Sequence, residues 1–248
     1  MKVVTHHEFH EVYTKEPAAA PGRIEAILEA IRPEVTLEEA MPAGWDDIEA
    51  IHTRDHVDTV TRRGLYKIAA LAAGATIQAA LIGLSEPCFA LVRPPGHHAS
   101  AESSWGFCYF NNIAVALDHL VRHSHIQTAY VLDFDLHFGD GTVSILKPKG
   151  YAAIHNPMAE HRQVYLKEVA THLSSAKADI IAVSAGFDNH LLDWGQVLHT
   201  EDYHEIGRMV WETCRRLEIG CFAVLEGGYN HQVLGECVQA FLRGMEGR

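Results

Sequence analysis

The stretch "AYVLDFDLHFGDG", residues 129–141, gives the strongest indication of the fold. Its first half is a continuous apolar run, which is typical of a strand buried on both faces of a parallel sheet. Asp133, Asp135 and His137 then occur at alternate positions, before a glycine-rich loop. Because alternate residues of an extended segment share one face, Asp135 and His137 can converge on one ion. The stretch therefore predicts a buried strand, over residues 129–136, that carries a polar site at its end.

Three other apolar segments also end in polar, glycine-containing loops. "CFALV" is followed by "RPPGHHAS", "DIIAVS" by "AGFDNH", and "CFAVL" by "EGGYN". Further strands are predicted at residues 2–6, 35–40 and 151–155, and helices at 23–31, 55–63, 65–82, 111–123, 160–174, 201–217 and 232–245. This alternation predicts an α/β fold, a three-layer sandwich with a mostly parallel central sheet flanked by helices. Ligands bind at the carboxyl ends of such strands, so the polar loops are expected to form one site.

Composition limits the classes of function. The 248 residues are 48% hydrophobic and 21% charged, which fits one globular domain over residues 1–248. We see no apolar run of about 18 residues and no signal peptide, so we expect neither a membrane partner nor export. The five cysteines include no CxxC pair and fit reduced thiols in the cytoplasm. A net charge of −12 without a basic run argues against a nucleic-acid partner.

The residue types in these loops indicate metal and proton chemistry. Asp135, His137 and Asp188 are the predicted ligands of one metal ion, because two carboxylates and one imidazole suit Zn²⁺ or another divalent transition metal. Three protein ligands leave a coordination position open for water, as in catalytic sites. His97 and His98 follow two prolines in a stiff loop, where histidines can carry protons. The alternatives are that the aspartates cap a turn and that the histidines are surface residues.

Five segments carry a resemblance to a known family. In chain order they are "RPPGHHA", "GFCYFNN", "DFDLHFGDG", "SAGFD" and "EGGYN". They resemble the signature segments of the histone deacetylase superfamily, which includes bacterial acetylpolyamine amidohydrolases and shares its fold with arginase. The resemblance runs from about Arg93 to Asn230, and it extends more weakly into the N-terminal half through "GRIEAI", "IEAIHTRDHV" and "LAAGATIQAA".

The resemblance implies a role for each matching residue. Zinc would be bound by Asp135, His137 and Asp188, with His97 and His98 beside it. The other implied site residues are Asp133 and Asp140, which would orient the two histidines, Tyr229, which would donate a hydrogen bond to the substrate oxygen, and Gly106 and Phe107, which would line a tunnel for acyl-lysine. A structural K⁺ is also implied near Asp133.

The expected activity is zinc-dependent removal of an acyl group, in the first place acetyl, from an amine. The substrate would be a small-molecule or peptide N-acyl amine, such as acetyl-lysine or an N-acetylpolyamine, and the nucleophile a metal-activated water. We expect His98 to transfer the proton and His97 to contribute electrostatically. One alternative is a binuclear manganese ureohydrolase of arginase type, although that family has a further aspartate where His190 stands. The other alternative is a non-catalytic acyl-amine-binding protein.

One segment departs from the family. Between Asp140 and Asp179 the family usually has a long loop that supplies the second tunnel wall, and here the segment is short. Tyr165 or Pro157 could substitute for this wall, or a neighbouring chain of a homo-oligomer could supply it. Without such a wall, we expect a wide, shallow cleft that tolerates bulky acyl groups.

Overall fold

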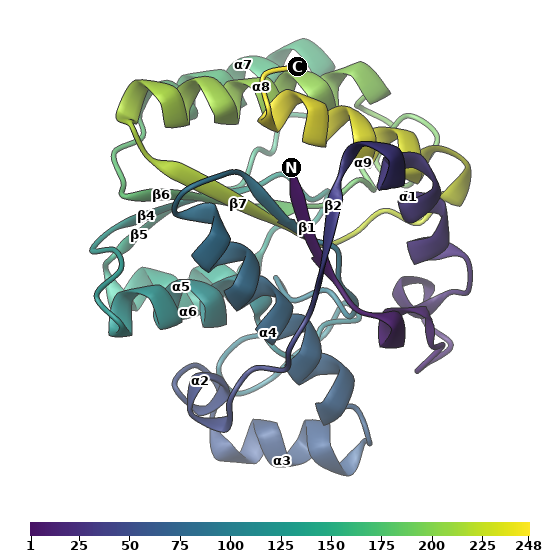
Figure 1. Cartoon of the computed structure of the whole chain (residues 1–248), viewed down its shortest axis with the longest axis vertical. Helices are drawn as coiled ribbons and strands as arrows, with labels where there is room; N and C mark the ends of the chain where they lie inside the picture. Colours follow the sequence, from purple (N-terminus) through teal and green to yellow (C-terminus); the bar gives the residue numbers. More distant parts are fainter.

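A computed structural model describes all 248 residues (Figure 1). One sheet contains seven strands in the order β2-β1-β3-β7-β6-β4-β5, and every pair of neighbours is parallel. The strands are β1 (Lys2–Thr5), β2 (Thr36–Glu39), β3 (Cys88–Ala90), β4 (Ala129–Asp133), β5 (Ala152–His155), β6 (Ile180–Ala185) and β7 (Gly220–Leu225). Strands β3, β4 and β6 are buried at every residue, as their continuous apolar sequences predict.

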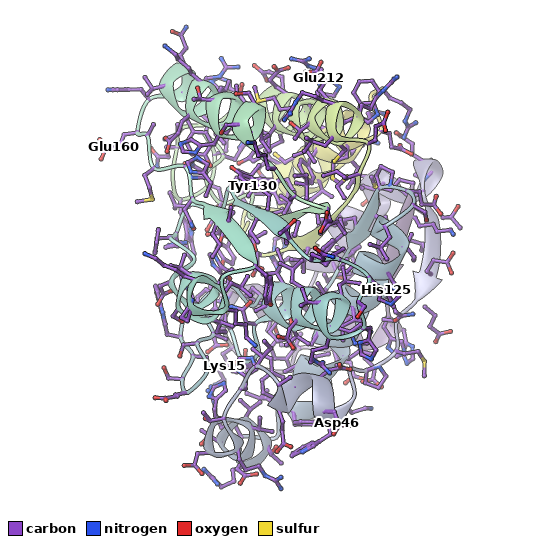
Figure 2. All side chains as sticks on the ribbon, turned by 90° about the vertical axis from the view of Figure 1, so that its left-hand side faces the viewer. Lys15, Asp46, His125, Tyr130, Glu160 and Glu212 are labelled. Carbon is purple, nitrogen blue, oxygen red and sulfur yellow. The ribbon has the colours of Figure 1, made fainter.

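The chain has nine α-helices. They are α1 (Arg23–Ile31), α2 (Trp45–Glu49), α3 (Arg54–Arg62), α4 (Tyr66–Gly83), α5 (Asn112–Arg122), α6 (Asp140–Lys149), α7 (Arg162–Ser175), α8 (Thr200–Leu217) and α9 (His231–Met245). Of these, α2 and α3 contact other helices rather than the sheet. Helices α1, α7, α8 and α9 cover one face of the sheet, and α4, α5 and α6 cover the other (Figure 1). The side view shows the same three layers, with Tyr130 in the sheet and Glu212 in the upper helical layer (Figure 2). The predicted three-layer α/β fold is confirmed.

Helix α4 corrects one expectation from the sequence. Tyr66–Gly83 has 18 residues and is long and apolar enough to cross a membrane, by length and composition alone. The run is not obvious in the sequence, because alanine is its most frequent residue and Lys67, Thr76 and Gln78 interrupt it. In the fold, 72% of this helix is buried, and it packs against β1, β3 and β7. Its apolar surface on all sides is therefore used within the protein core.

The segment after β4 also differs from the prediction. The strand ends at Asp133 rather than at residue 136, and Asp135 lies in a bend. Helix α6 then begins at Asp140 and was not predicted, because Pro148 and Gly150 suggest a loop. Pro148 lies in the last turn of this helix, and Gly150 ends it in the left-handed region with φ 75°. The short segment after Asp140 is thus mainly a helix that packs beside α5.

The strand order places the polar loops together. Strands β3, β7, β6 and β4 are consecutive neighbours, and all point the same way. Their carboxyl ends therefore bring four loops to one edge of the sheet. Below this edge, 68 buried residues form one connected hydrophobic core that runs from Val3 to Met245. The loops are consequently anchored on a rigid base.

Candidate active site

Three of the predicted ligands converge at this edge. One ligand atom each from Asp135, His137 and Asp188 lies within 4.8 Å of the other two. His137 Nδ1 is 3.2 Å from Asp135 Oδ1 and 3.1 Å from Asp188 Oδ2. The carboxylates are 4% and 0% exposed, so water does not solvate them. The sequence therefore identified side chains that come from two different strands and meet in space.

The main chain orients both carboxylates toward a common point. Asp135 Oδ2 accepts a hydrogen bond from Gly227 N at 2.8 Å, and Asp188 Oδ1 accepts one from Leu136 N at 3.1 Å. The second oxygen of Asp188 is buried, and its polar contact is His137 Nδ1 at 3.1 Å, a member of the same cluster. Two buried carboxylates side by side are costly unless positive charge is near them. Two oriented carboxylates and one imidazole therefore fit a divalent metal ion.

The electrostatics of this cluster support the same fit. Burial, together with the nearby Asp135, raises the pKa of Asp188 to about 6. Hydrogen bonds to Asp135 and Asp188 raise the pKa of His137 to about 10. A protonated imidazole thus compensates the two carboxylates, and a divalent cation would provide the same compensation at a higher charge.

The tandem histidines lie beside the cluster, each on its own carboxylate. His97 Nδ1 is 3.1 Å from Asp133 Oδ2, and His98 Nδ1 is 2.6 Å from Asp140 Oδ1. These contacts leave Nε2 of each ring to face the site, and His97 Nε2 is 3.7 Å from Asp135 Oδ1. The ring centroids of the two histidines are 4.0 Å apart. The predicted pairings with Asp133 and Asp140 are thus present.

The two histidines differ in their expected charge. Burial and the adjacent His97 lower the pKa of His98 to about 4. For His97, burial opposes protonation, but the carboxylates of Asp135 and Asp133 outweigh it and raise its pKa well above the usual value. Near neutral pH one imidazole is therefore neutral, and the other is charged.

Both oxygens of Asp133 already have partners. Oδ2 contacts the His97 ring, and Oδ1 accepts from the main-chain N of Asp135 at 3.3 Å. The structure offers no unpartnered carboxylate oxygen for the K⁺ expected here, so that site remains a prediction.

Three buried residues that the sequence analysis did not assign to the site bind the main chain of the loops that follow β3 and β7. Glu226 Oε2 accepts hydrogen bonds from Gly96 N at 2.6 Å and His97 N at 3.1 Å, which secures the tandem-histidine loop. Arg23 donates to the carbonyl oxygens of Glu226 and Gly228, at 2.6 and 2.8 Å. Asp193 Oδ2 accepts from the main-chain N of both residues that follow Gly228, each at 2.7 Å. Arg23 and Glu226 lie in two of the segments that resemble the family, "GRIEAI" and "EGGYN", so the sequence offered a reason to consider them. Asp193 lies in none of these segments.

A small aromatic pocket leads to this cluster. Its volume is about 90 Å³, and it is lined by Pro95, His97, His98, Trp105, Gly106, Phe107, His137, Trp194, Gly227 and Tyr229. The Tyr229 ring stacks on Trp194 with centroids 4.1 Å apart and meets the edge of Phe107 at 5.9 Å. Trp105 stacks on His98 at 3.7 Å, and its Nε1 donates to Asp140 at 2.9 Å. Gly106 has φ 57°, and any Cβ there would collide with the His98 ring.

This pocket corrects the expectation about the missing wall. Tyr165 does not contribute, because it is fully enclosed and its hydroxyl donates to Phe134 O at 3.0 Å. Pro157 lines a separate hollow beside Leu136. Trp194, from the loop after β6, lines the pocket together with Phe107, and the pocket is small, at about 90 Å³, rather than a wide, shallow cleft. Because Trp194 comes from the loop after β6, the length of the segment between Asp140 and Asp179 does not predict this side of the pocket.

His190, which distinguishes this chain from the ureohydrolase alternative, faces away from the cluster. Its Nε2 is 3.2 Å from Thr200 Oγ1, and its Nδ1 accepts from Leu192 N at 3.1 Å. The carboxylates of Asp135 and Asp188 join His137 in the cluster, and His190 is not one of its members.

Comparisons with known proteins agree with this geometry. A family model described as histone deacetylase domain matches residues 58–157 and 153–245. A "probable deacetylase" of Methanothermobacter thermautotrophicus is 31% identical in an alignment 304 positions long, gaps included, which covers 99% of this chain and 91% of that protein. A "histone deacetylase-like amidohydrolase" of Pseudomonas aeruginosa is 26% identical, over 94% of this chain and 79% of that protein.

A solved structure shows the same fold. The crystal structure of the HDA15 HD domain superposes with a TM-score of 0.82 at 21% identity, over 99% of this chain and 89% of that one. The family model matches more than half of the chain. The carboxylates, histidines and tyrosine of this protein meet at one edge of the sheet. The chain therefore belongs to the histone deacetylase family.

Proposed function

We propose that this protein is a zinc-dependent deacetylase. It would hydrolyse the amide bond between a short acyl group, in the first place acetyl, and a linear amine such as acetyl-lysine or an N-acetylpolyamine. The observation that carries the proposal is the buried Asp135–His137–Asp188 cluster below an aromatic pocket, with two carboxylate-bound histidines at its side.

The metal-binding residues would be Asp135, His137 and Asp188. A bound zinc ion supplies Lewis-acid polarisation of the carbonyl and lowers the pKa of a water molecule. The feature of the chain that supports a cation most directly is the pair of buried carboxylates, Asp135 and Asp188, beside the His137 imidazole. The remaining chemistry depends on protein groups around the pocket.

Tyr229 is placed to stabilise the negative charge that develops on the carbonyl oxygen. Its ring is fixed by Trp194 and Phe107, and its main-chain N is held by Asp193. Its hydroxyl forms no hydrogen bond within the protein and is free to donate to the substrate. A preorganised donor of this kind acts where charge appears in the transition state.

His98 is the proposed proton carrier. Its Nδ1 is bound to Asp140, so Nε2 can accept a proton from the attacking water while the carbon–oxygen bond forms. The same nitrogen then gives the proton to the amine as the carbon–nitrogen bond breaks. The low pKa of His98 keeps it unprotonated at the start, and the charged His97 adds positive potential near the reacting oxygen.

The pocket favours short acyl groups on slender amines. A volume of about 90 Å³ between Phe107, Trp194 and Tyr229 leaves room for an alkyl chain rather than for a bulky group. Aromatic faces also attract cations, and the net charge of −12 favours positively charged substrates. Acetyl-lysine peptides and acetylated polyamines share these properties.

A substrate panel tests the proposal. Zinc-loaded protein would be assayed on acetyl-, propionyl- and butyryl-lysine peptides and on N-acetylated diamines and polyamines, with Asp188→Ala as the metal-deficient control. We expect hydrolysis that is fastest for acetyl and absent in the control. If no substrate is hydrolysed faster than by the control while binding calorimetry still detects complexes, the protein binds acyl amines without catalysis.

A further inference from the structure

A second cluster of metal-ligand side chains lies at the edge of the sheet. His155 ends the edge strand β5, and it faces Glu168 and His172 of α7. One ligand atom from each of the three residues lies within 4.8 Å of the other two. Figure 2 labels Glu160, which lies in the loop between β5 and α7. The cluster shares no residue with the active site.

The spacing of these residues fits a shared ion. Glu168 and His172 are four residues apart, so they lie on one face of α7. His155 Nε2 is 3.6 Å from Glu168 Oε1. Two ligands of a tetrahedral zinc ion, each about 2.0–2.1 Å from the metal, are about 3.4 Å apart. His155 Nε2 and Glu168 Oε1 are therefore already close to the separation that two zinc ligands require.

The third donor can reach the same point. The rings of His155 and His172 are stacked, with centroids 3.6 Å apart and planes at 12°. Nitrogens of stacked rings cannot direct their lone pairs at one ion, so one ring must turn. His172 is exposed and can rotate about its side-chain bonds, whereas His155 is held, with only 11% of its side chain exposed.

The buried ring of His155 has a nitrogen without a hydrogen-bond partner. Its Nε2 is inaccessible to solvent and makes no hydrogen bond. Glu168 is oriented by a hydrogen bond from Met158 N to its other oxygen, at 3.3 Å. A cation would satisfy the buried nitrogen and leave this support intact.

We propose that His155, Glu168 and His172 form a second site for a divalent transition metal, with water completing its coordination. Imidazole and carboxylate donors in this combination suit Zn²⁺ and its neighbours in the first transition row. The ion would join the end of β5 to α7, so its role would be structural. Because β5 is an edge strand paired only with β4, such a link would restrain the least supported strand of this half of the sheet.

Zinc stoichiometry in four proteins tests the site. Metal-free protein would be equilibrated with Zn²⁺, freed of excess metal by gel filtration and measured by elemental analysis. We expect two zinc ions per chain in the wild type and one each in His172→Ala and Asp188→Ala. The matched control is His161→Ala, which removes an exposed histidine next to α7 that lies outside the cluster and should retain two.

Thermal unfolding gives a second readout that does not depend on activity. Zn²⁺ should raise the melting temperature of Asp188→Ala, in which only the second site remains, and should not raise that of Asp188→Ala combined with Glu168→Gln. Equal zinc content in the wild type and His172→Ala would overturn the proposal, as would an equal loss in His161→Ala. The result is independent of the proposed deacetylase function, because His172→Ala should keep whatever activity the wild type has.

Discussion

Replacement of Tyr229 by phenylalanine isolates the contribution of one hydroxyl group. The ring keeps its stacking on Trp194 at 4.1 Å and its edge contact with Phe107 at 5.9 Å. The hydroxyl has no partner within the protein, so its removal leaves no buried donor or acceptor unsatisfied. We therefore expect the free energy of unfolding to change by less than about 0.5 kcal/mol, as for ordinary substitutions outside the core.

The effect on catalysis should be much larger. A single donor to a developing oxyanion contributes about 3 kcal/mol to the transition state, which corresponds to a loss of about 10²–10³ in kcat. Zinc content should stay at the wild-type value, because Asp135, His137 and Asp188 keep their contacts. The expected pattern is thus an intact, metal-loaded protein with a greatly reduced rate.

A matched control separates this role from a general effect of losing a tyrosine hydroxyl. Tyr130 in β4 is buried, and its hydroxyl also lacks a hydrogen-bond partner (Figure 2). Tyr130→Phe should therefore retain full activity. The assay is kcat and kcat/KM on an acetyl-lysine peptide, with single-turnover rates to establish that chemistry limits kcat. A Tyr229→Phe rate within threefold of the wild type under those conditions would refute the assignment.

Three further outcomes are expected. Asp188→Ala should lose most of the active-site metal and the activity while far-UV circular dichroism stays unchanged; full retention of that metal would exclude Asp188 as a ligand. Trp194→Ala removes an aromatic contact worth about 1 kcal/mol and opens the pocket, so kcat/KM for acetyl-lysine should fall about fivefold while butyryl-lysine is affected less; an equal loss on both would show that Trp194 does not select acyl size. Burial raises the pKa of Glu226 to about 7, above the 4.5 of an ordinary glutamate, so the folded state binds more protons between these values. The free energy of unfolding should therefore fall by up to about 3 kcal/mol as pH rises from 4.5 to 7, and Glu226→Gln should flatten this dependence in denaturant titrations, whereas an unchanged slope would contradict it.

Much of the fold and of the metal cluster could be predicted from the sequence. A continuous apolar run such as that of β4 indicates a buried parallel strand, and the polar loop after each run indicates the site edge. Asp135, His137 and Asp188 were identified because their residue types suit one ion. The bounds of the elements were less well predicted: the strand ends at Asp133, and α6 was missed because Pro148 disrupts its pattern.

The sequence by itself determined the fold class and the chemistry available at the sheet edge, because both follow from local patterns within single segments. Only the tertiary structure decided which aromatic rings form the pocket and which charges support the loops. Trp194 stacks on Tyr229, which is 35 residues away in the sequence. Glu226 accepts a hydrogen bond from the main-chain N of Gly96, which is 130 residues away. Such contacts leave no periodic signal in the chain. They arise because the sheet places β3, β7 and β6 side by side, so that residues with no local relation share one small volume.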